Sequence, residues 1–182
     1  MNKICVIYTK ATGTHQPFEK VYKKNLFGFA RMMSISWIIS IRTKEDQYKI
    51  EKEEHYIIKP RCMVIPDNLE ITNEKANEIG TEIDVVLDKF KEDMKDRSIK
   101  LIISQDLDFH LRTLQAELIR YNKAIDFNKY LLIDINNLVD KKHNLDELCV
   151  MYLNIQKEKQ CNNICSLFFK LYNNYEKKVL ES

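Results

Sequence analysis

The chain has 182 residues, of which 45% are hydrophobic and 31% are charged. This composition is typical of a folded protein rather than a disordered one, and the length predicts one domain spanning residues 1–182. The formal net charge of +2 is too small to indicate a nucleic-acid partner by itself, and no apolar run reaches the roughly 20 residues of a membrane span. The five scattered cysteines indicate reduced thiols, as in the cytoplasm or another reducing intracellular compartment.

The first half of the chain predicts three strands. Lys3–Thr9 is rich in β-branched residues and predicts a central strand. Met32–Arg42 is almost entirely apolar and predicts a second, buried strand. Tyr48–Ile58 alternates charged and apolar residues, so we expect a strand with one solvated face that pairs antiparallel to its predecessor.

Between the first two strands, residues 15–30 show no clear period but mix basic residues with aromatic rings. Lysines that contact phosphates and rings that stack on bases would make a contact surface for a single strand of nucleic acid. The same composition is also typical of a loop whose rings anchor it to the core. The residues concerned are Phe18, Lys20, Tyr22, Lys23, Lys24, Phe27, Phe29 and, just beyond, Arg31.

The second half alternates helices and strands. The spacing of apolar residues predicts a helix over Glu82–Lys95 and another over Leu107–Tyr121, the latter following a short buried strand at Leu101–Ile103. We expect Asp106 or Ser104 to cap that helix. A polar corner between a buried strand and a helix is a frequent place for an active site.

Three further elements complete the chain, a strand at Tyr130–Ile135 and helices at Leu145–Leu153 and Ile164–Tyr175. Hairpins followed by alternating strands and helices predict an α/β fold. We expect a ribonuclease-H-like mixed sheet, with antiparallel hairpins and then parallel strands, covered by helices on both faces.

Several segments, in order and spacing, resemble the DEDDh (DnaQ-like) branch of the 3′–5′ exonuclease superfamily over most of the chain. The segment FHLRTLQAELIR is similar to the family's second motif and its helix, and ARMMSISW is similar to a strand of bacterial and viral members. The matching segments are Phe109–Arg120, Ala30–Trp37, Tyr56–Pro60, Ile71–Ala76 with Gly80, and Leu145–Leu148.

The resemblance implies a site with four acidic residues, which hold two divalent metal ions, and a histidine as general base. The first motif aligns on residues 8–13, where the turn Thr12-Gly13 is retained but Tyr8 and Lys10 stand at the acidic positions. In the second motif, the aspartate position falls on His110, directly after Phe109. The third-motif aspartate falls near Gln160. We therefore expect no metal, no cofactor and no catalytic residue.

The resemblance thus predicts a catalytically inactive exonuclease-like protein that binds nucleic acid or serves as a scaffold subunit in a nucleic-acid-processing complex. The candidate contacts for a single strand are Lys10, Thr12, Gly13, Lys23, Lys24, Arg31, Phe109 and His110. Two alternatives stand beside this prediction. One is a protein-interaction module without nucleic acid, and the other is an active exonuclease that uses Mg²⁺ or Mn²⁺ with unorthodox ligands.

Overall fold

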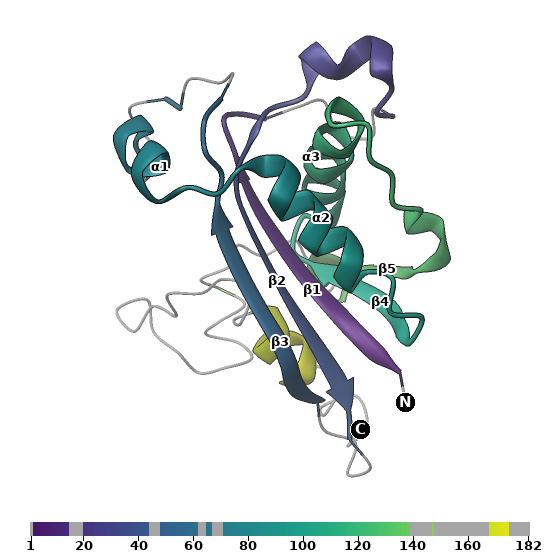
Figure 1. Cartoon of the computed structure of the whole chain (residues 1–182). Helices are drawn as coiled ribbons and strands as arrows, with labels where there is room; N and C mark the ends of the chain where they lie inside the picture. The colour runs from purple at the N-terminus through teal and green to yellow at the C-terminus, as the bar shows by residue number, and fades with distance from the viewer. Residues whose placement is uncertain are drawn as a thin grey trace.

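The protein is described by a computed structural model, which covers residues 2–14, 20–43, 48–61, 65–66, 71–138, 147 and 168–174 (Figure 1). The strands are β1 (Lys3–Ala11), β2 (Met32–Arg42), β3 (Tyr48–Ile57), β4 (Ile99–Ser104) and β5 (Leu131–Asp134). The α-helices are α1 (Asn73–Ile79), α2 (Ile83–Asp93) and α3 (Leu107–Arg120), and residues 168–174 are also helical. Three 3₁₀ turns complete the set: η1 (Lys23–Gly28), η2 (Phe127–Lys129) and η3 (Ile135–Leu138).

The five strands form one mixed sheet in the order β3-β2-β1-β4-β5. β1, β2 and β3 pair antiparallel, and β4 and β5 continue the sheet in parallel on the other side of β1. This topology confirms the predicted α/β mixed sheet, with its antiparallel hairpins followed by parallel strands. β1 lies at the centre, between its antiparallel and parallel neighbours (Figure 1).

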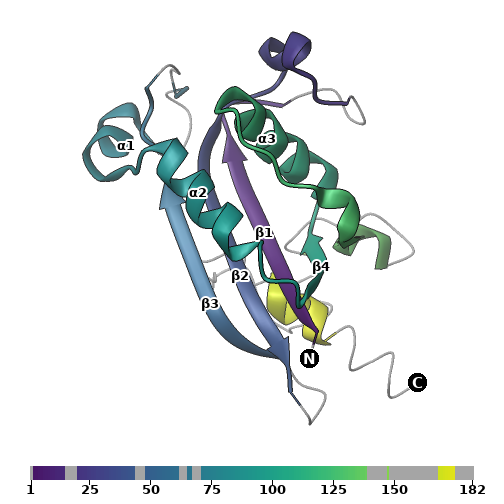
Figure 2. The ribbon, with the colours of Figure 1, turned by 45° about the vertical axis from the view of Figure 1, so that its right-hand side comes forward.

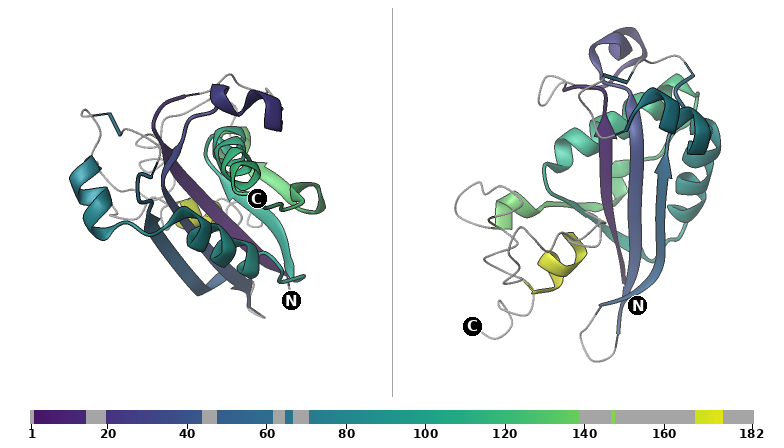
Figure 3. Two further views of the ribbon diagram at one scale, coloured as in Figure 1. Left: turned by 45° about the horizontal axis from the view of Figure 1, so that its top comes forward. Right: turned by 90° about the vertical axis from the view of Figure 1, so that its left-hand side faces the viewer.

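Each face of the sheet carries its own apolar layer. Cys5 and Ile7 of β1 point toward α2 and α3, where Phe90 and Leu114 are fully buried. Val6, in the alternate position of β1, points to the other face and packs with Phe168. Figures 2 and 3 show α2 and α3 on one side of the sheet and the helix of residues 168–174 on the opposite side. Covering on both faces explains why β2 is buried along most of its length.

The structure adds α1, a helix that the apolar period does not predict. Thr72 caps it by accepting a hydrogen bond from the Lys75 amide, at 3.2 Å. The helix ends at Gly80, where a Cβ atom would lie 2.1 Å from the Ala76 carbonyl oxygen. Gly80 therefore permits the close approach that brings Thr81 into a bridge with Ile58, at the end of β3.

The remaining predicted elements are placed as follows. The strand predicted at Tyr130–Ile135 is confirmed as β5, although Ile135 already belongs to η3. The helix predicted at Leu145–Leu153 lies outside the described residues, apart from position 147, and the helix predicted at Ile164–Tyr175 is described only over 168–174. No helix in the described part of the chain is long and apolar enough to cross a membrane.

Candidate functional site

The candidate site lies where β1 extends beyond β4. β2 pairs with β1 over Lys3–Ala11, whereas β4 pairs with β1 only over Lys3–Val6. After β4 the chain turns into α3, which runs beside the second half of β1 (Figure 2). The backbone of β1 from Ile7 onward therefore meets side chains from the corner between β4 and α3.

Two of these side chains take over the hydrogen bonds that a longer β4 would make. The Ser104 hydroxyl donates to the Ile7 carbonyl oxygen at 2.7 Å. The Thr9 amide donates to His110 Nδ1 at 3.1 Å, and the Thr9 hydroxyl lies 2.9 Å from the same nitrogen. Because Nδ1 accepts the amide hydrogen, the ring proton of neutral His110 resides on Nε2. His110 is only 4% exposed and completes the hydrogen bonding of the sheet edge.

The structure brings Tyr8 and His110 together, two of the positions at which the resemblance implies metal-binding acids. Their ring centroids lie 4.9 Å apart, and the Phe168 ring packs edge-on with Tyr8 at a centroid distance of 5.9 Å. Phe109 contacts the His110 ring at 5.4 Å. Aromatic rings thus occupy the space between the end of β1 and the start of α3. Such a set supplies none of the hard carboxylate oxygens that Mg²⁺ prefers.

Lys10 follows Tyr8 on the same side of β1 and is half-buried. Its positive charge reaches His55 on β3, whose Nδ1 lies 2.7 Å from the Ser36 hydroxyl. The pKa of His55 is lowered below 6.5, first by desolvation of the ring and then by the charge of Lys10. Within the described ranges, no group of three or more His, Cys, Asp or Glu side chains could hold a metal ion.

Thr12 and Arg31 join the two ends of the segment between β1 and β2. The Thr12 amide donates to the Arg31 carbonyl at 2.9 Å, and the Arg31 amide donates to the Thr12 hydroxyl at 3.0 Å. The Arg31 side chain pairs with Glu117 on α3, with Nε at 2.8 Å from Oε1. Gly13 is exposed beside this junction. Arg31 therefore contributes to the fold here, and its guanidinium is already bound to a carboxylate.

Glu117 is the centre of a buried ionic cluster and is 0% exposed. Its carboxylate accepts hydrogen bonds from Arg31, from Arg120 at 2.8 Å and from the Met32 amide at 3.1 Å. Arg120 also donates to the Leu26 carbonyl at 2.6 Å and to the Phe29 carbonyl at 2.7 Å. The cluster therefore joins α3 to η1 and β2, which gives a structural role to residues on which the sequence resemblance rests.

Lys23 and Lys24 lie apart from the corner formed by Tyr8, Lys10 and His110. Both belong to η1, which packs against the end of α3 near Arg120. Ten residues of helix separate His110 from Arg120, a rise of about 15 Å. The predicted contacts therefore form two groups rather than one. Gln160, near which the resemblance places the third-motif aspartate, lies outside the described residues.

The prediction that Asp106 or Ser104 caps α3 is wrong. Ser104 uses its hydroxyl on β1, and the Asp106 side chain makes no capping hydrogen bond. Instead, Asp134 at the end of β5 accepts hydrogen bonds from the amides of Asp106, at 3.2 Å, and Leu107, at 2.9 Å. Because β5 lies parallel to β4, its carboxyl end meets the start of α3. An acid at the end of a neighbouring parallel strand is the signal that could have identified this cap.

Comparisons with known proteins identify the fold. No model of a known protein family matches the sequence, and no curated protein matches it. E. coli exonuclease I in complex with a dT13 oligonucleotide has a TM-score of 0.58 at 12% identity, covering 89% of this chain and 32% of that chain. The complex with a dA16 oligonucleotide has a TM-score of 0.72 at 11% identity, covering 100% of this chain and 42% of that chain.

A chain in the structure of the yeast NOT1 MIF4G domain co-crystallized with CAF1 has a TM-score of 0.64 at 13% identity, covering 97% of this chain and 80% of that chain. This chain spans about a third of the length of the exonuclease I chain bound to dT13. At these identities the likeness concerns the fold. The sequence therefore folds as the ribonuclease-H-like domain that exonuclease I contains.

Proposed function

We propose that this chain is a non-catalytic relative of the DEDDh exonucleases that binds single-stranded nucleic acid without cleaving it. The observation that carries the proposal is the set of side chains at three family positions. Tyr8, Lys10 and His110 stand where acids would hold metal ions, and His110 already accepts the Thr9 amide.

The charge at these positions argues against two-metal hydrolysis. Two divalent ions about 4 Å apart, which together stabilise the attacking and the leaving oxygen, need several carboxylates as ligands. An ammonium group at Lys10 would repel each ion at short range, in a half-buried place where water screens poorly. If His110 Nδ1 turned away from β1 to bind a metal ion, the Thr9 amide would lose its hydrogen-bond acceptor.

The absence of acids at Tyr8, Lys10 and His110 has a second consequence, since these three positions add no negative charge that would repel phosphates. Lysines and rings are the two components of surfaces that hold single strands without reading sequence. E. coli exonuclease I, which has a similar fold, is known in complex with dT13 and dA16 oligonucleotides and with single-stranded DNA. These points support nucleic-acid binding as the retained property.

The test combines cleavage and binding on the same labelled single-stranded DNA and RNA. We expect no shortening of either strand with Mg²⁺ or Mn²⁺, under conditions in which an active exonuclease degrades both. We also expect binding, measured by fluorescence anisotropy in EDTA, that weakens steeply as salt increases. Metal-dependent cleavage that EDTA abolishes would overturn the proposal, as would a lack of binding at low ionic strength.

A further inference from the structure

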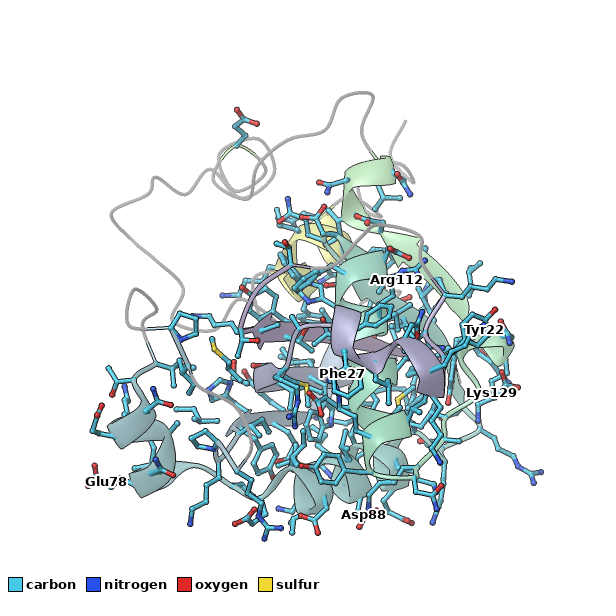
Figure 4. All side chains as sticks on the ribbon, turned by 90° about the horizontal axis from the view of Figure 1, so that it is seen from above. Tyr22, Phe27, Glu78, Asp88, Arg112 and Lys129 are labelled. Carbon is cyan, nitrogen blue, oxygen red and sulfur yellow. The ribbon has the colours of Figure 1, made fainter. Side chains whose placement is uncertain are left out.

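The η1 segment presents aromatic rings to solvent in an unusual way. Phe27 is fully exposed, at 105% of its reference area, and Tyr22 is 49% exposed. Figure 4 shows both side chains along η1, on the outside of the molecule above α3. Phe29, by contrast, is buried at 3% and anchors the segment to the core. Phe18 lies outside the described residues; of the other predicted rings, Phe29 serves the core, and Tyr22 and Phe27 are available to a ligand.

The backbone that carries these rings is firmly held. Arg120 donates to the carbonyls of Leu26 and Phe29, on both sides of Phe27. At the other end of η1, the Asn25 side chain accepts from the Tyr22 amide at 2.7 Å and donates to the Lys20 carbonyl at 2.9 Å. Because the turn is fixed before a ligand arrives, little conformational entropy is lost on binding.

The charge around the rings is positive. Lys20, Lys23 and Lys24 surround Tyr22 in sequence; one acid, Glu19, precedes them, and residues 20–43 contain no Asp or Glu. The Lys24 ammonium lies 6.0 Å from the Tyr22 ring centroid. Within the described part of the chain, no carboxylate forms an ion pair with these three lysines, and the nearby Glu117 is neutralised by Arg31 and Arg120. An anionic ligand fits this surface better than an apolar one.

An open hollow beside η1 extends the same surface. It has a volume of about 500 Å³ and is lined by Lys23, Ile119, Arg120, Asn122, Lys123 and Ala124. The Lys123 ammonium pairs with Asp88, and Arg120 is engaged as described above, so Lys23 is the cation that the hollow offers to a phosphate. The surface thus combines rings at its rim with a cationic recess.

We propose that η1, rather than the corner of Tyr8, Lys10 and His110, is the main contact for a single strand of nucleic acid. In this arrangement Phe27 and Tyr22 stack on bases, and Lys23 and Lys24 neutralise phosphates. This inference rests on the proposed function and relocates its surface. It follows from the exposure of Tyr22 and Phe27 to solvent. His110 and Arg31, by contrast, already form hydrogen bonds within the fold.

The test compares variants in the anisotropy assay with a fluorescent single-stranded oligonucleotide. The double variant Tyr22→Ala/Phe27→Ala should weaken binding about 10-fold or more, since each stacked base contributes substantially to affinity. The double variant Lys23→Gln/Lys24→Gln should reduce the slope of log K against log salt by about 1.4, because each phosphate contact on a single strand contributes about 0.7. Ile79→Ser, at an exposed apolar residue of α1, is the matched control and should bind normally.

Circular dichroism and thermal unfolding check that all variants fold. Lys10→Glu distinguishes the two surfaces, and we expect it to weaken binding much less than Tyr22→Ala/Phe27→Ala does. If Lys10→Glu abolishes binding while the η1 variants bind normally, the inference fails but the proposed function stands. If the ring variant weakens binding but the lysine variant leaves the salt slope unchanged, η1 is an apolar docking surface and the inference also fails. If the wild-type protein does not bind, the proposed function itself fails.

Discussion

The Nδ1 atom of His110 accepts the backbone amide of Thr9, a residue 101 positions earlier in the chain. At this position the resemblance implies an aspartate that binds metal. Here the side chain instead satisfies an amide at the edge of β1, where β4 no longer pairs with it. The side chain at this position is therefore integrated into the sheet, which links its identity to the stability of the fold.

His110→Ala tests this role. The substitution leaves the Thr9 amide unpaired in a buried place and opens a void beside Tyr8, so we expect a loss of about 2 to 4 kcal/mol in the free energy of unfolding. His110→Asn is the matched control, because its side-chain oxygen can occupy the position of Nδ1. Chemical denaturation should show a smaller loss for Asn than for Ala. Equal losses would mean that ring packing, rather than the hydrogen bond, holds His110 in place.

The ionic cluster at Glu117 gives a second prediction. Glu117→Gln leaves Arg31 and Arg120 close together without their shared counter-charge, and we expect a loss on the order of 3 kcal/mol. Glu92→Gln, which removes an exposed pair with Lys95, should cost less than about 1 kcal/mol. Urea unfolding of the two variants and the wild type at neutral pH measures both losses. Similar costs for the two variants would contradict the structural role assigned to the cluster.

Local patterns explain which parts of the fold the sequence predicts. β2 matches its prediction because its apolar run is rich in β-branched isoleucine, which favours a strand, and α2 and α3 follow the helical period closely. α1 and η1 have few buried residues, Ala76 in α1 and none in η1, so neither produces a clear apolar period. Their existence depends on caps and on Arg120, which contacts η1 from 91 or more positions away.

The site residues follow the same division. Sequence comparison places Tyr8 and His110 at corresponding motif positions, and the structure brings them into contact. Sequence does not reveal that Arg31 is bound to Glu117, because that partner lies 86 positions away on another element. A basic residue near rings therefore looks the same whether it faces solvent or a buried carboxylate. The sequence likewise does not reveal that Lys23 lies far from Lys10. That distance is set by α3, which contacts β1 at His110 and η1 at Arg120.

Asp134 supplies the third prediction. Its carboxylate accepts the first amides of α3 and lies at the positive end of the helix dipole. We expect Asp134→Ala to cost about 1 to 2 kcal/mol, as loss of a cap usually does. Asp106→Gly is the control: it removes the exposed hydrogen bond that Asn136 donates to Asp106, but glycine adopts the left-handed φ of 51° without strain, so the loss should be less than about 1 kcal/mol. If Asp106→Gly lost more stability than Asp134→Ala, Asp106 would be the residue that caps α3.

The last prediction concerns pH. The pKa of His55 is lowered by desolvation and by Lys10, so between its ordinary value of 6.5 and its folded value the unfolded chain binds the proton that the folded chain does not. Stability therefore falls as the pH decreases below about 6.5, the ordinary pKa of histidine. In Lys10→Gln the repulsion is gone, and we expect the pKa of His55 to rise while remaining below 6.5 because the desolvation persists.

NMR titration of the His55 ring measures this shift directly, and acid unfolding of the variant should begin at a lower pH than in the wild type. Lys49→Gln is the matched control. It removes an exposed lysine from the same strand, six residues and about 20 Å away. At that distance, beyond the Debye length of about 8 Å at physiological salt, the pKa of His55 should not change. If both variants shift the pKa equally, net charge rather than the position of Lys10 controls His55. If neither does, Lys10 does not face His55, and the arrangement of the corner beside β1 is wrong.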